Sequence, residues 1–210
     1  MGCVVEYKFD RPDWFSSAKP LFDRMLSPYR AAPSKFLEIG SYEGRSAVWL
    51  LDNILTHPES HLTCVDPCYK RTEANLRFNL SPHIELGKCR LISTFSEVAI
   101  PKLLSDDEAG TYDFVYIDGC HHSEYVLRDA AFSFLLTKVG GLIAFDDYKW
   151  THGGKRPGVW GPKPAIDSFL SVHEGSLEIL VKGWQVWVRK IKNFPVMVWG
   201  EEPFQQFEEG

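Results

Sequence analysis

Residues 36–51, FLEIGSYEGRSAVWLL, decide the fold of this chain. An apolar run leads into a loop that contains Gly40 and Gly44, and a helix is expected to begin near Ser46. Glycine lets the backbone turn tightly and approach a ligand, because it has no Cβ. The amides at the start of the helix then face that ligand. By itself the pattern indicates either a ligand-binding loop or an ordinary strand-to-helix turn.

Short apolar runs alternate with helix-like stretches from residue 35 onward, which is typical of a mostly parallel sheet with helices on both faces. A parallel crossover needs about a dozen residues. Because almost nothing except Gly183 separates the last two runs, we expect them to form an antiparallel hairpin. The predicted fold class is α/β, a Rossmann-like, seven-stranded, mostly parallel sheet with a C-terminal antiparallel hairpin. The predicted strands are residues 35–39, 61–65, 90–93, 113–117, 142–145, 177–182 and 184–190.

The clearest predicted helix follows the fourth strand. Apolar residues recur there at three-to-four spacing from Val126 to Leu135, and Gly140-Gly141 is expected to end the helix. No repeat or linker divides the 210 residues, which indicates one globular domain. Within it we expect an N-terminal helical cap at residues 1–34, a ligand-binding body at 35–190, and an apolar and acidic tail at 191–210.

The composition favours a small-molecule partner. The chain has 23 basic and 28 acidic residues and is 44% hydrophobic, a balance that excludes intrinsic disorder. No basic stripe is present, so no nucleic-acid partner is expected. No run approaches the roughly 18 apolar residues of a membrane helix, and no secretory signal is visible, so we expect no membrane partner and a cytoplasmic protein. The five cysteines lack metal-binding spacing and are expected to be free thiols.

Asp66 ends the second predicted strand, HLTCVD, 22 residues after Gly44. An acid at this place accepts hydrogen bonds from both ribose hydroxyls of a nucleotide. The glycine loop lacks the GxGxxG spacing of a pyrophosphate site, so a nucleoside without pyrophosphate fits better. S-adenosylmethionine is such a nucleoside, because its ribose needs the acid and its aminocarboxyl end needs the amides of the loop.

Three carboxylates lie at the ends of predicted strands. Asp118 follows the fourth strand and Asp146-Asp147 follow the fifth, and the carboxyl ends of adjacent parallel strands meet at one edge of a sheet. Acids placed so close repel one another unless they are protonated, separated or neutralised by a cation. A hard divalent ion with oxygen ligands, Mg²⁺ above all, is therefore expected. The alternative is that Asp147 caps a turn and Asp118 contacts only the cofactor.

The segment EIGSYEGRSAV resembles the first motif of the metal-dependent, catechol-type class I O-methyltransferases, including Tyr42 in place of the usual middle glycine. The segments STFSEVAIPKL, YDFVYIDG and VGGLIAFDDY follow in matching order, so the resemblance covers about residues 35 to 190. The stretch from IDGCHH to DDY also resembles the bacterial sugar O-methyltransferases, another magnesium-dependent group. The resemblance implies the metal ligands Asp118, Asp146 and Asp147. The cofactor-binding residues expected from motif and resemblance together are Glu38, Gly40, Ser41, Tyr42, Gly44, Ser46, Asp66, Phe95, Ser96, Asp118 and Cys120.

His121 is the candidate catalytic base. In the catechol-type family a lysine three residues after the metal-binding acid takes the hydroxyl proton, and His121 stands at that position. The sugar-type enzymes use an acid two residues after, where this chain departs with Cys120. An imidazole, with an ordinary pKa of about 6.5, keeps a usable neutral fraction at neutral pH. A structural role for His121 stays open, and such a role is expected of His122.

These residues together predict methyl transfer from S-adenosylmethionine to a hydroxyl of a small molecule, a diol, sugar or phenol, with a divalent metal. Two alternatives stay open: a metal-independent N-, S- or C-methyltransferase, and a catalytically inactive module that binds S-adenosylmethionine. Residues 151–164 hold four glycines and three prolines and are expected to form a flap that includes His152, Lys155, Arg156 and Trp160. The apolar tail from Phe194 is expected to dock on its own domain or on the second subunit of a homodimer.

Overall fold

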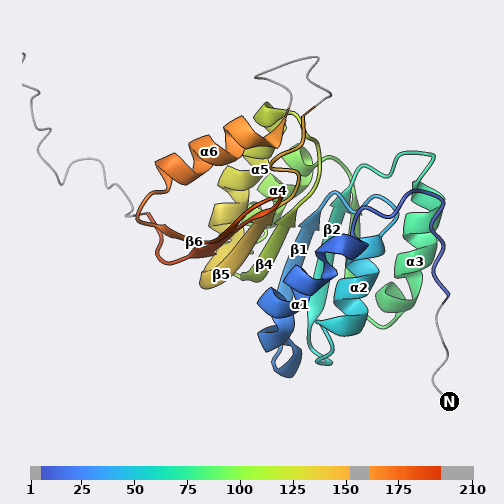
Figure 1. Cartoon of the computed structure of the whole chain (residues 1–210). Coiled ribbons are helices and arrows are strands. Elements are labelled where there is room, and N and C mark those ends of the chain that lie inside the picture. Colours follow the sequence, from blue (N-terminus) through green and yellow to red (C-terminus); the bar gives the residue numbers. More distant parts are fainter. Residues whose placement is uncertain (1–5, 152–160, 195–210) are drawn as a thin grey trace, which may run out of the picture.

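A seven-stranded sheet forms the centre of the computed structural model, which describes residues 6–151 and 161–194 (Figure 1). The strand order is β3-β2-β1-β4-β5-β7-β6. Neighbours among β1 to β5 are parallel, whereas β7 is antiparallel to both β5 and β6. The predicted mixed sheet with its C-terminal hairpin is thus confirmed. The strands are β1 (Lys35–Ile39), β2 (His61–Asp66), β3 (Cys89–Ser93), β4 (Tyr112–Ile117), β5 (Thr137–Phe145), β6 (Leu177–Lys182) and β7 (Val186–Lys190).

Helices cover both faces of the sheet and bury two separate cores (Figure 1). The first core lies under α1, α2 and α3, and the second lies under α4, α5 and α6. Among the described residues, no helix has the length and apolar character that crossing a bilayer requires. The helices are the short 3₁₀ turns η1 (Ser16–Ala18) and η2 (Ser27–Ala31), and α1 (Lys19–Leu26), α2 (Arg45–Asn53), α3 (Glu73–Glu85), α4 (Ser96–Ser105), α5 (Ser123–Leu136) and α6 (Pro162–Val172).

The N-terminal helix α1 is built into the first core. Its Phe22 is fully buried and meets the rings of Phe114, Tyr116 and Trp187 edge-on, with centroids 6.2, 5.0 and 4.9 Å away. Edge-to-face pairs of this kind add to the free energy gained by burying the rings. The three partners stand on β4 and β7, so α1 fastens the middle of the sheet to its C-terminal hairpin.

The structure corrects the predicted end of α5. The helix ends at Leu136, and Gly140-Gly141 lie inside β5 rather than after the helix. Tyr112 of β4 pairs with Thr137 of β5, and Phe114 of β4 pairs with Leu142. The register of the two strands therefore shifts between these pairs, and the extra β5 residues include Gly140-Gly141. Gly140 has φ +89°, and a Cβ on Gly141 would lie 3.1 Å from the Asp113 carbonyl oxygen. The glycines therefore serve a bulge in the strand, a role that sequence spacing does not separate from a helix cap.

A buried lysine caps the carboxyl end of α5. The ammonium group of Lys190 donates to the carbonyl oxygens of Phe134 and Thr137, at 2.6 and 2.8 Å, and only 2% of the residue is exposed. Cations favour the carboxyl end of a helix, where carbonyl groups lack partners. Burial nevertheless lowers the pKa of Lys190 to about 8. The side chain thus joins β7 to the turn between α5 and β5.

We predict that Lys190→Met lowers the free energy of unfolding by about 1–3 kcal/mol at pH 7, because two buried carbonyl groups lose their donor. The unfolded state, with a lysine pKa of about 10.4, binds more protons than the folded state between pH 8 and 10. The contribution of Lys190 to stability therefore rises with pH in that window. Urea denaturation at pH 7 and 9.5 measures both effects, and Lys192→Met, at an exposed site, is the matched control. A gap between the native protein and Lys190→Met that stays constant over this pH range would contradict the linkage.

Candidate active site

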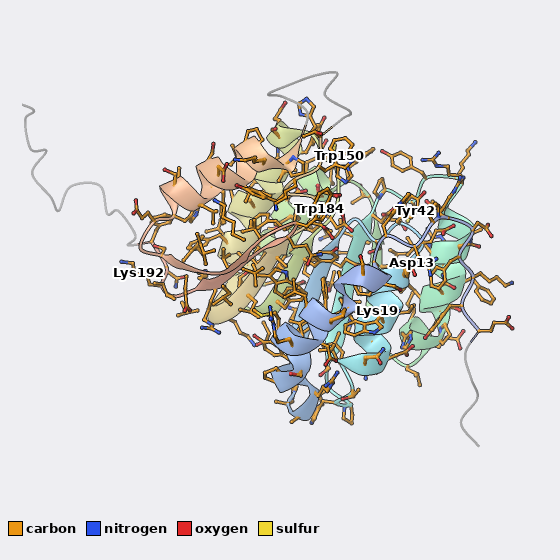
Figure 2. The ribbon with its side chains drawn as sticks, viewed as in Figure 1. Asp13, Lys19, Tyr42, Trp150, Trp184 and Lys192 are labelled. Carbon is orange, nitrogen blue, oxygen red and sulfur yellow. The ribbon has the colours of Figure 1, made fainter. Side chains whose placement is uncertain are left out.

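The candidate site residues gather where β1, β4 and β5 end. Three backbone hydrogen bonds extend the parallel ladder beyond the strands: Gly40 N–H donates to Val65 O at 2.8 Å, Asp118 N–H to Ile39 O at 2.9 Å, and Asp146 N–H to Ile117 O at 3.0 Å. Each loop is thereby held against its neighbour at the edge that ligands occupy in open α/β sheets. Figure 2 shows Tyr42 and Trp150 at this end of the molecule, and Lys192 on another side.

The glycine-rich loop packs directly on the loop after β4. Gly40 has φ +88°, and a Cβ there would lie 2.2 Å from the Asp118 carbonyl oxygen, closer than any two such atoms can stand. Gly44, with φ +81°, is the residue before α2, and its Cβ would press on Leu76 at 3.2 Å. Tyr42 also has positive φ, at 55°. The predicted loop is present, and its glycines are required both by conformation and by space.

Two acids, Asp66 and Glu38, hold the glycine-rich loop and the start of α2 in place by hydrogen bonds. Asp66 accepts the Tyr42 N–H at 2.9 Å on one carboxylate oxygen and the Cys68 N–H at 2.7 Å on the other, which leaves further lone pairs for a ribose. Glu38 is fully buried and accepts the Ser46 hydroxyl at 2.5 Å. Burial raises the pKa of Glu38 to about 7, against the lowering effect of the Ser41 and Ser46 hydroxyls. Glu38 thus supports the loop rather than standing open to a ligand.

Phe95 and Ser96, two further predicted cofactor-binding residues, lie at the start of α4. Phe95, half exposed, precedes α4 and meets the Tyr69 ring with centroids 6.4 Å apart. Ser96 opens α4 and hydrogen-bonds to the buried carboxyl group of Asp129, whose pKa burial raises to about 6. Cys120, in the loop between β4 and α5, is exposed and carries a free thiol, and Cys64, Cys68 and Cys89 are free as well. Asp129, on α5, was not predicted from the sequence.

The hydroxyl group of Tyr116 contacts the carboxylates of both Asp118 and Asp146. The Tyr116 hydroxyl lies 3.2 Å from Asp118 Oδ2 and also donates to Asp146 Oδ2. Burial and the charges of Asp146 and Asp147 raise the pKa of Asp118 well above its ordinary value. Burial likewise raises the pKa of Asp146. Within the described residues, no lysine or arginine forms an ion pair with either acid, so the negative charge of this edge is not balanced by a protein cation.

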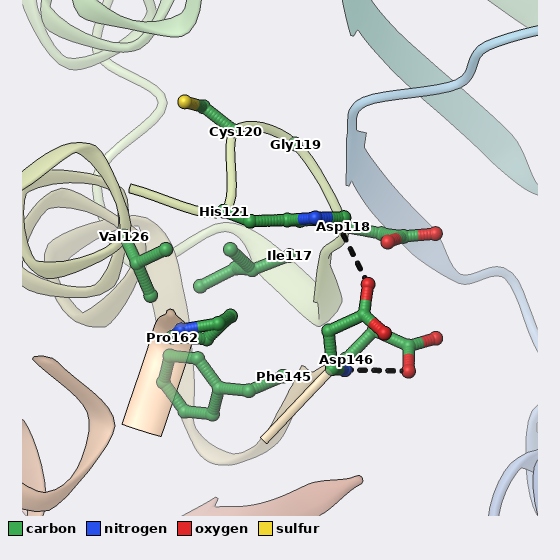
Figure 3. A pocket seen from close by; sticks show the side chains of 10 residues that line it. Ile117, Asp118, Gly119, Cys120, His121, Val126, Phe145, Asp146 and Pro162 are labelled. Carbon is green, nitrogen blue, oxygen red and sulfur yellow. Dashed lines mark hydrogen bonds and ion pairs between the residues drawn. The ribbon is translucent and has the colours of Figure 1, made fainter. Parts of the chain in front are cut away.

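His121 faces the third acid. Its Nε2 lies 2.8 Å from Asp147 Oδ2, as the dashed contact in Figure 3 shows. Asp147 has φ 56°, a left-handed conformation that aspartate tolerates at a local strain cost. Among residues 6–151 and 161–194, the ligand atoms of Asp118, His121 and Asp147 lie within 4.8 Å of one another, a grouping that does not include Asp146. These three side chains also line a small pocket with Cys120.

The structure thus brings the predicted acids and His121 to one place, but the contacts that Asp146 makes differ from those predicted. Asp118, Asp146, Asp147 and His121 do share one end of the sheet. Asp146, expected beside the other two acids as a ligand, makes its contacts with Tyr116 and with the side-chain amide of Gln185, at 2.8 Å to the latter. His122 is the last residue before α5, and the structural role expected of it stays a prediction. The sequence did offer one signal for Tyr116, because it stands near the end of β4, two positions before Asp118, and alternate residues of an extended chain share a face.

A further acid, Glu43, ties the N-terminal segment to the glycine loop. Glu43 is 2% exposed, and its carboxylate accepts the backbone N–H groups of Asp10 at 3.3 Å and Arg11 at 3.0 Å. Trp14, which follows in the chain, lies 5.6 Å from the Tyr42 ring, centroid to centroid. The N-terminal segment therefore packs against the glycine-rich loop at Tyr42 and Glu43. The sequence pattern around Glu43 did not indicate this contact.

Two described residues bracket the segment 152–160. The Trp150 ring lies 4.7 Å from the His121 ring, and the Gly161 N–H donates to the His121 carbonyl oxygen at 3.1 Å. The Ser123 hydroxyl also donates to the Gly161 carbonyl oxygen, at 2.6 Å. The predicted flap residues His152, Lys155, Arg156 and Trp160 lie outside the described residues, as does the tail from residue 195.

A sequence profile whose description is methyltransferase domain matches residues 37–148, more than half of the chain. The chain belongs to this methyltransferase family. The matched region runs from β1 to the residue after the Asp146-Asp147 pair, so it contains both the glycine loop and the acidic edge. The prediction from the sequence that this chain is a methyltransferase is thus confirmed.

Two curated relatives of this methyltransferase align over part of their length. An uncharacterized protein, R132 of Acanthamoeba polyphaga mimivirus, is 27% identical over 157 residues, 72% of this chain and 66% of the viral protein. A caffeoyl-CoA O-methyltransferase of Populus kitakamiensis is 28% identical over 120 residues, 54% of this chain and 46% of the plant protein. The chain thus spans less than two thirds of the length of either relative.

Among solved structures, an O-methyltransferase from Bacillus cereus in complex with SAH superposes with a TM-score of 0.64. The two are 13% identical, and the match covers 85% of this chain and 83% of the bacterial one. At 13% identity the superposition shows a shared fold and nothing more, and it is consistent with the sheet described above.

We predict that Gly40→Ala disrupts the glycine loop of this methyltransferase. The new Cβ would meet backbone atoms of the Asp118 loop, which cannot move aside as a flexible side chain does. We expect the affinity for S-adenosylmethionine to fall by about tenfold or more, measured by isothermal titration calorimetry, with a lower melting temperature. Gly87→Ala is the matched control, because Gly87 also has positive φ but a Cβ there meets no atom within 4 Å. Equal binding by both variants would show that close packing at Gly40 is unimportant.

Proposed function

We propose that this methyltransferase transfers a methyl group from S-adenosylmethionine to a hydroxyl of a small molecule, with a divalent metal ion at the acidic edge. The observation that carries the proposal is the set of three carboxylates with a histidine at the end of β4 and β5, beside a glycine loop built for a nucleoside. The relative from Populus is named an O-methyltransferase, which supports oxygen as the acceptor atom. The Bacillus cereus structure holds SAH, which supports S-adenosylmethionine as the donor.

The residues fit a hard cation. Asp118 and Asp147 offer two carboxylate oxygens that lie within 4.8 Å of each other and of an imidazole nitrogen of His121. The raised pKa of Asp118, caused by burial and then by its acidic neighbours, means that the charged form is unfavourable without a nearby positive charge. Asp118 and Asp147 would hold the ion, with Asp146 next to them. A bound divalent ion lowers the pKa of a hydroxyl by stabilising its conjugate base.

The chain's own residues would do three things in the reaction. The loop at Gly40 and Asp66 would fix the donor so that its methyl carbon faces the acidic edge, and proximity of this kind supplies much of the rate. His121 would accept the hydroxyl proton. The oxygen lone pair then forms the O–C bond while the C–S bond breaks and its electron pair returns to sulfur, which leaves S-adenosylhomocysteine. The Trp150 ring beside His121 would offer an apolar wall to a planar or sugar ring.

A chelator and an acid variant test the metal. We predict that EDTA abolishes turnover of a panel of catechols and vicinal diols and that Mg²⁺ restores it. We also predict that Asp146→Ala lowers turnover by about 100-fold while the affinity for S-adenosylmethionine stays within about twofold, because the hydrogen bonds of Asp146 go to Tyr116, Gln185 and the Asp147 N–H and not to the glycine loop. Asp106→Ala, at an exposed ion pair on the end of α4, is the control. Turnover that survives both treatments would favour a metal-independent methyltransferase, and donor binding without any turnover would favour an inactive binding module.

A separate variant assigns the role of His121. We predict that His121→Ala lowers kcat by about 100-fold or more, as expected for loss of a general base, while Mn²⁺ affinity in electron paramagnetic resonance titrations is unchanged. His57→Ala, a change distant from the edge, should alter neither quantity. A fall in Mn²⁺ affinity for His121→Ala would instead identify the imidazole as a metal ligand, and an unchanged kcat would leave it a structural residue.

A further inference from the structure

The acid Asp146 is held by a relay of side chains that begins in the sheet core. The Trp187 indole N–H donates to Gln185 Oε1 at 3.0 Å, and Gln185 Nε2 donates to Asp146 Oδ2 at 2.8 Å. Trp187 is fully buried, and Gln185 is 6% exposed. The relay therefore runs through the interior, from the hairpin strand β7 to the residue after β5.

The chemistry of the two ends fixes the orientation of the amide. An indole N–H can only donate, so the Gln185 atom facing Trp187 must be the oxygen. A carboxylate oxygen accepts, so the atom facing Asp146 must be the nitrogen. The two ends require the same orientation. In a flipped amide the NH₂ group would face the Trp187 N–H, and the amide oxygen would face the Asp146 carboxylate. Gln185 thus has one orientation, set by Trp187.

Trp187 itself has little freedom to move. Its ring stacks on Phe114, with centroids 5.2 Å apart and planes 11° from parallel, and meets Phe22 edge-on at 4.9 Å. The turn that carries Gln185 is closed by the Gly183 N–H to Gln185 O bond at 2.8 Å and joined to the Asp146 loop by the Tyr148 N–H to Trp184 O bond at 2.9 Å. The start of the relay is consequently held in place by the packed core and by two backbone hydrogen bonds.

The relay continues beyond Asp146. Oδ2 of this acid accepts from Gln185 and from the Tyr116 hydroxyl, while Oδ1 accepts the Asp147 N–H at 2.7 Å. Three donors thus fix the Asp146 carboxylate in one rotamer. The last of these bonds closes the left-handed turn at Asp147, whose carboxylate reaches His121.

We propose that Gln185 is a positioning residue for the acidic edge: it fixes Asp146 by hydrogen bonding and, through the Asp146–Asp147 turn, aims the Asp147 carboxylate. The effect on turnover rests on the proposed function, whereas the positioning itself does not. Second-layer hydrogen bonds of this kind change metal affinity by about 10- to 100-fold in other proteins. None of the sequence motifs includes Gln185 or Trp187.

The test compares three variants by two measurements. Gln185→Met removes the donor and keeps a similar side-chain length. Trp187→Phe removes the indole N–H and keeps a buried ring. Trp184→Phe, at an exposed neighbour in the same turn, is the matched control. Amide hydrogen exchange at Asp147, followed by NMR in the metal-free protein, reports the Asp146–Asp147 turn directly, and Mn²⁺ titration reports the acidic edge.

We expect Asp147 amide exchange to accelerate by about tenfold in Gln185→Met and in Trp187→Phe but not in Trp184→Phe, while amides in β1 keep their protection. Mn²⁺ affinity should fall by about tenfold in Gln185→Met, with the affinity for S-adenosylmethionine unchanged. Unchanged exchange at Asp147 in Gln185→Met overturns the proposal, whatever the metal result. If the native protein binds no Mn²⁺, the metal part of the proposed function fails, and the exchange data still decide the role of Gln185.

Discussion

The crowding of three carboxylates at one end of a parallel sheet is the constraint around which the site is organised. Register places the residues after β4 and β5 side by side, and the ladder bond from Asp146 to Ile117 leaves the chain no way to separate them. Each acid instead has its own partners: Tyr116 for Asp118, Tyr116 and Gln185 for Asp146, and His121 for Asp147. Among the described residues, no lysine or arginine forms an ion pair with any of the three acids, and this lack of a paired cation is why a metal ion belongs in the proposed chemistry.

Much of the framework could be read from the sequence, because strand ends and tight turns have local signatures. The alternating apolar runs identified every strand, and the closeness of the last two runs predicted the hairpin. The positions of Asp66, Asp118 and Asp146-Asp147 at strand ends were predicted for the same reason. The exception within the framework is Gly140-Gly141, where the same two residues suit a helix end or a bulge and only pairing with β4 decides.

The parts that sequence reasoning missed depend on contacts between distant segments. Gln185 and Trp187 lie about 40 residues after Asp146, and nothing in their own neighbourhood marks them as part of the site. Glu43 reads as one more polar residue in a loop until Asp10 and Arg11 are seen to donate to it. Tertiary packing, not local pattern, assigns these roles, so a single sequence could not have revealed them.

The anchoring of Gly161 has an evolutionary consequence. Its amide and its carbonyl group are both held beside His121, by the backbone of that histidine and by Ser123, while Trp150 lies against the imidazole ring from the opposite direction in the chain. Insertions or replacements between these two fixed points would leave the acids and the imidazole where they are, and loop closure becomes costlier only slowly with added length. Selection could therefore change the length and composition of residues 152–160 without rebuilding the acidic edge.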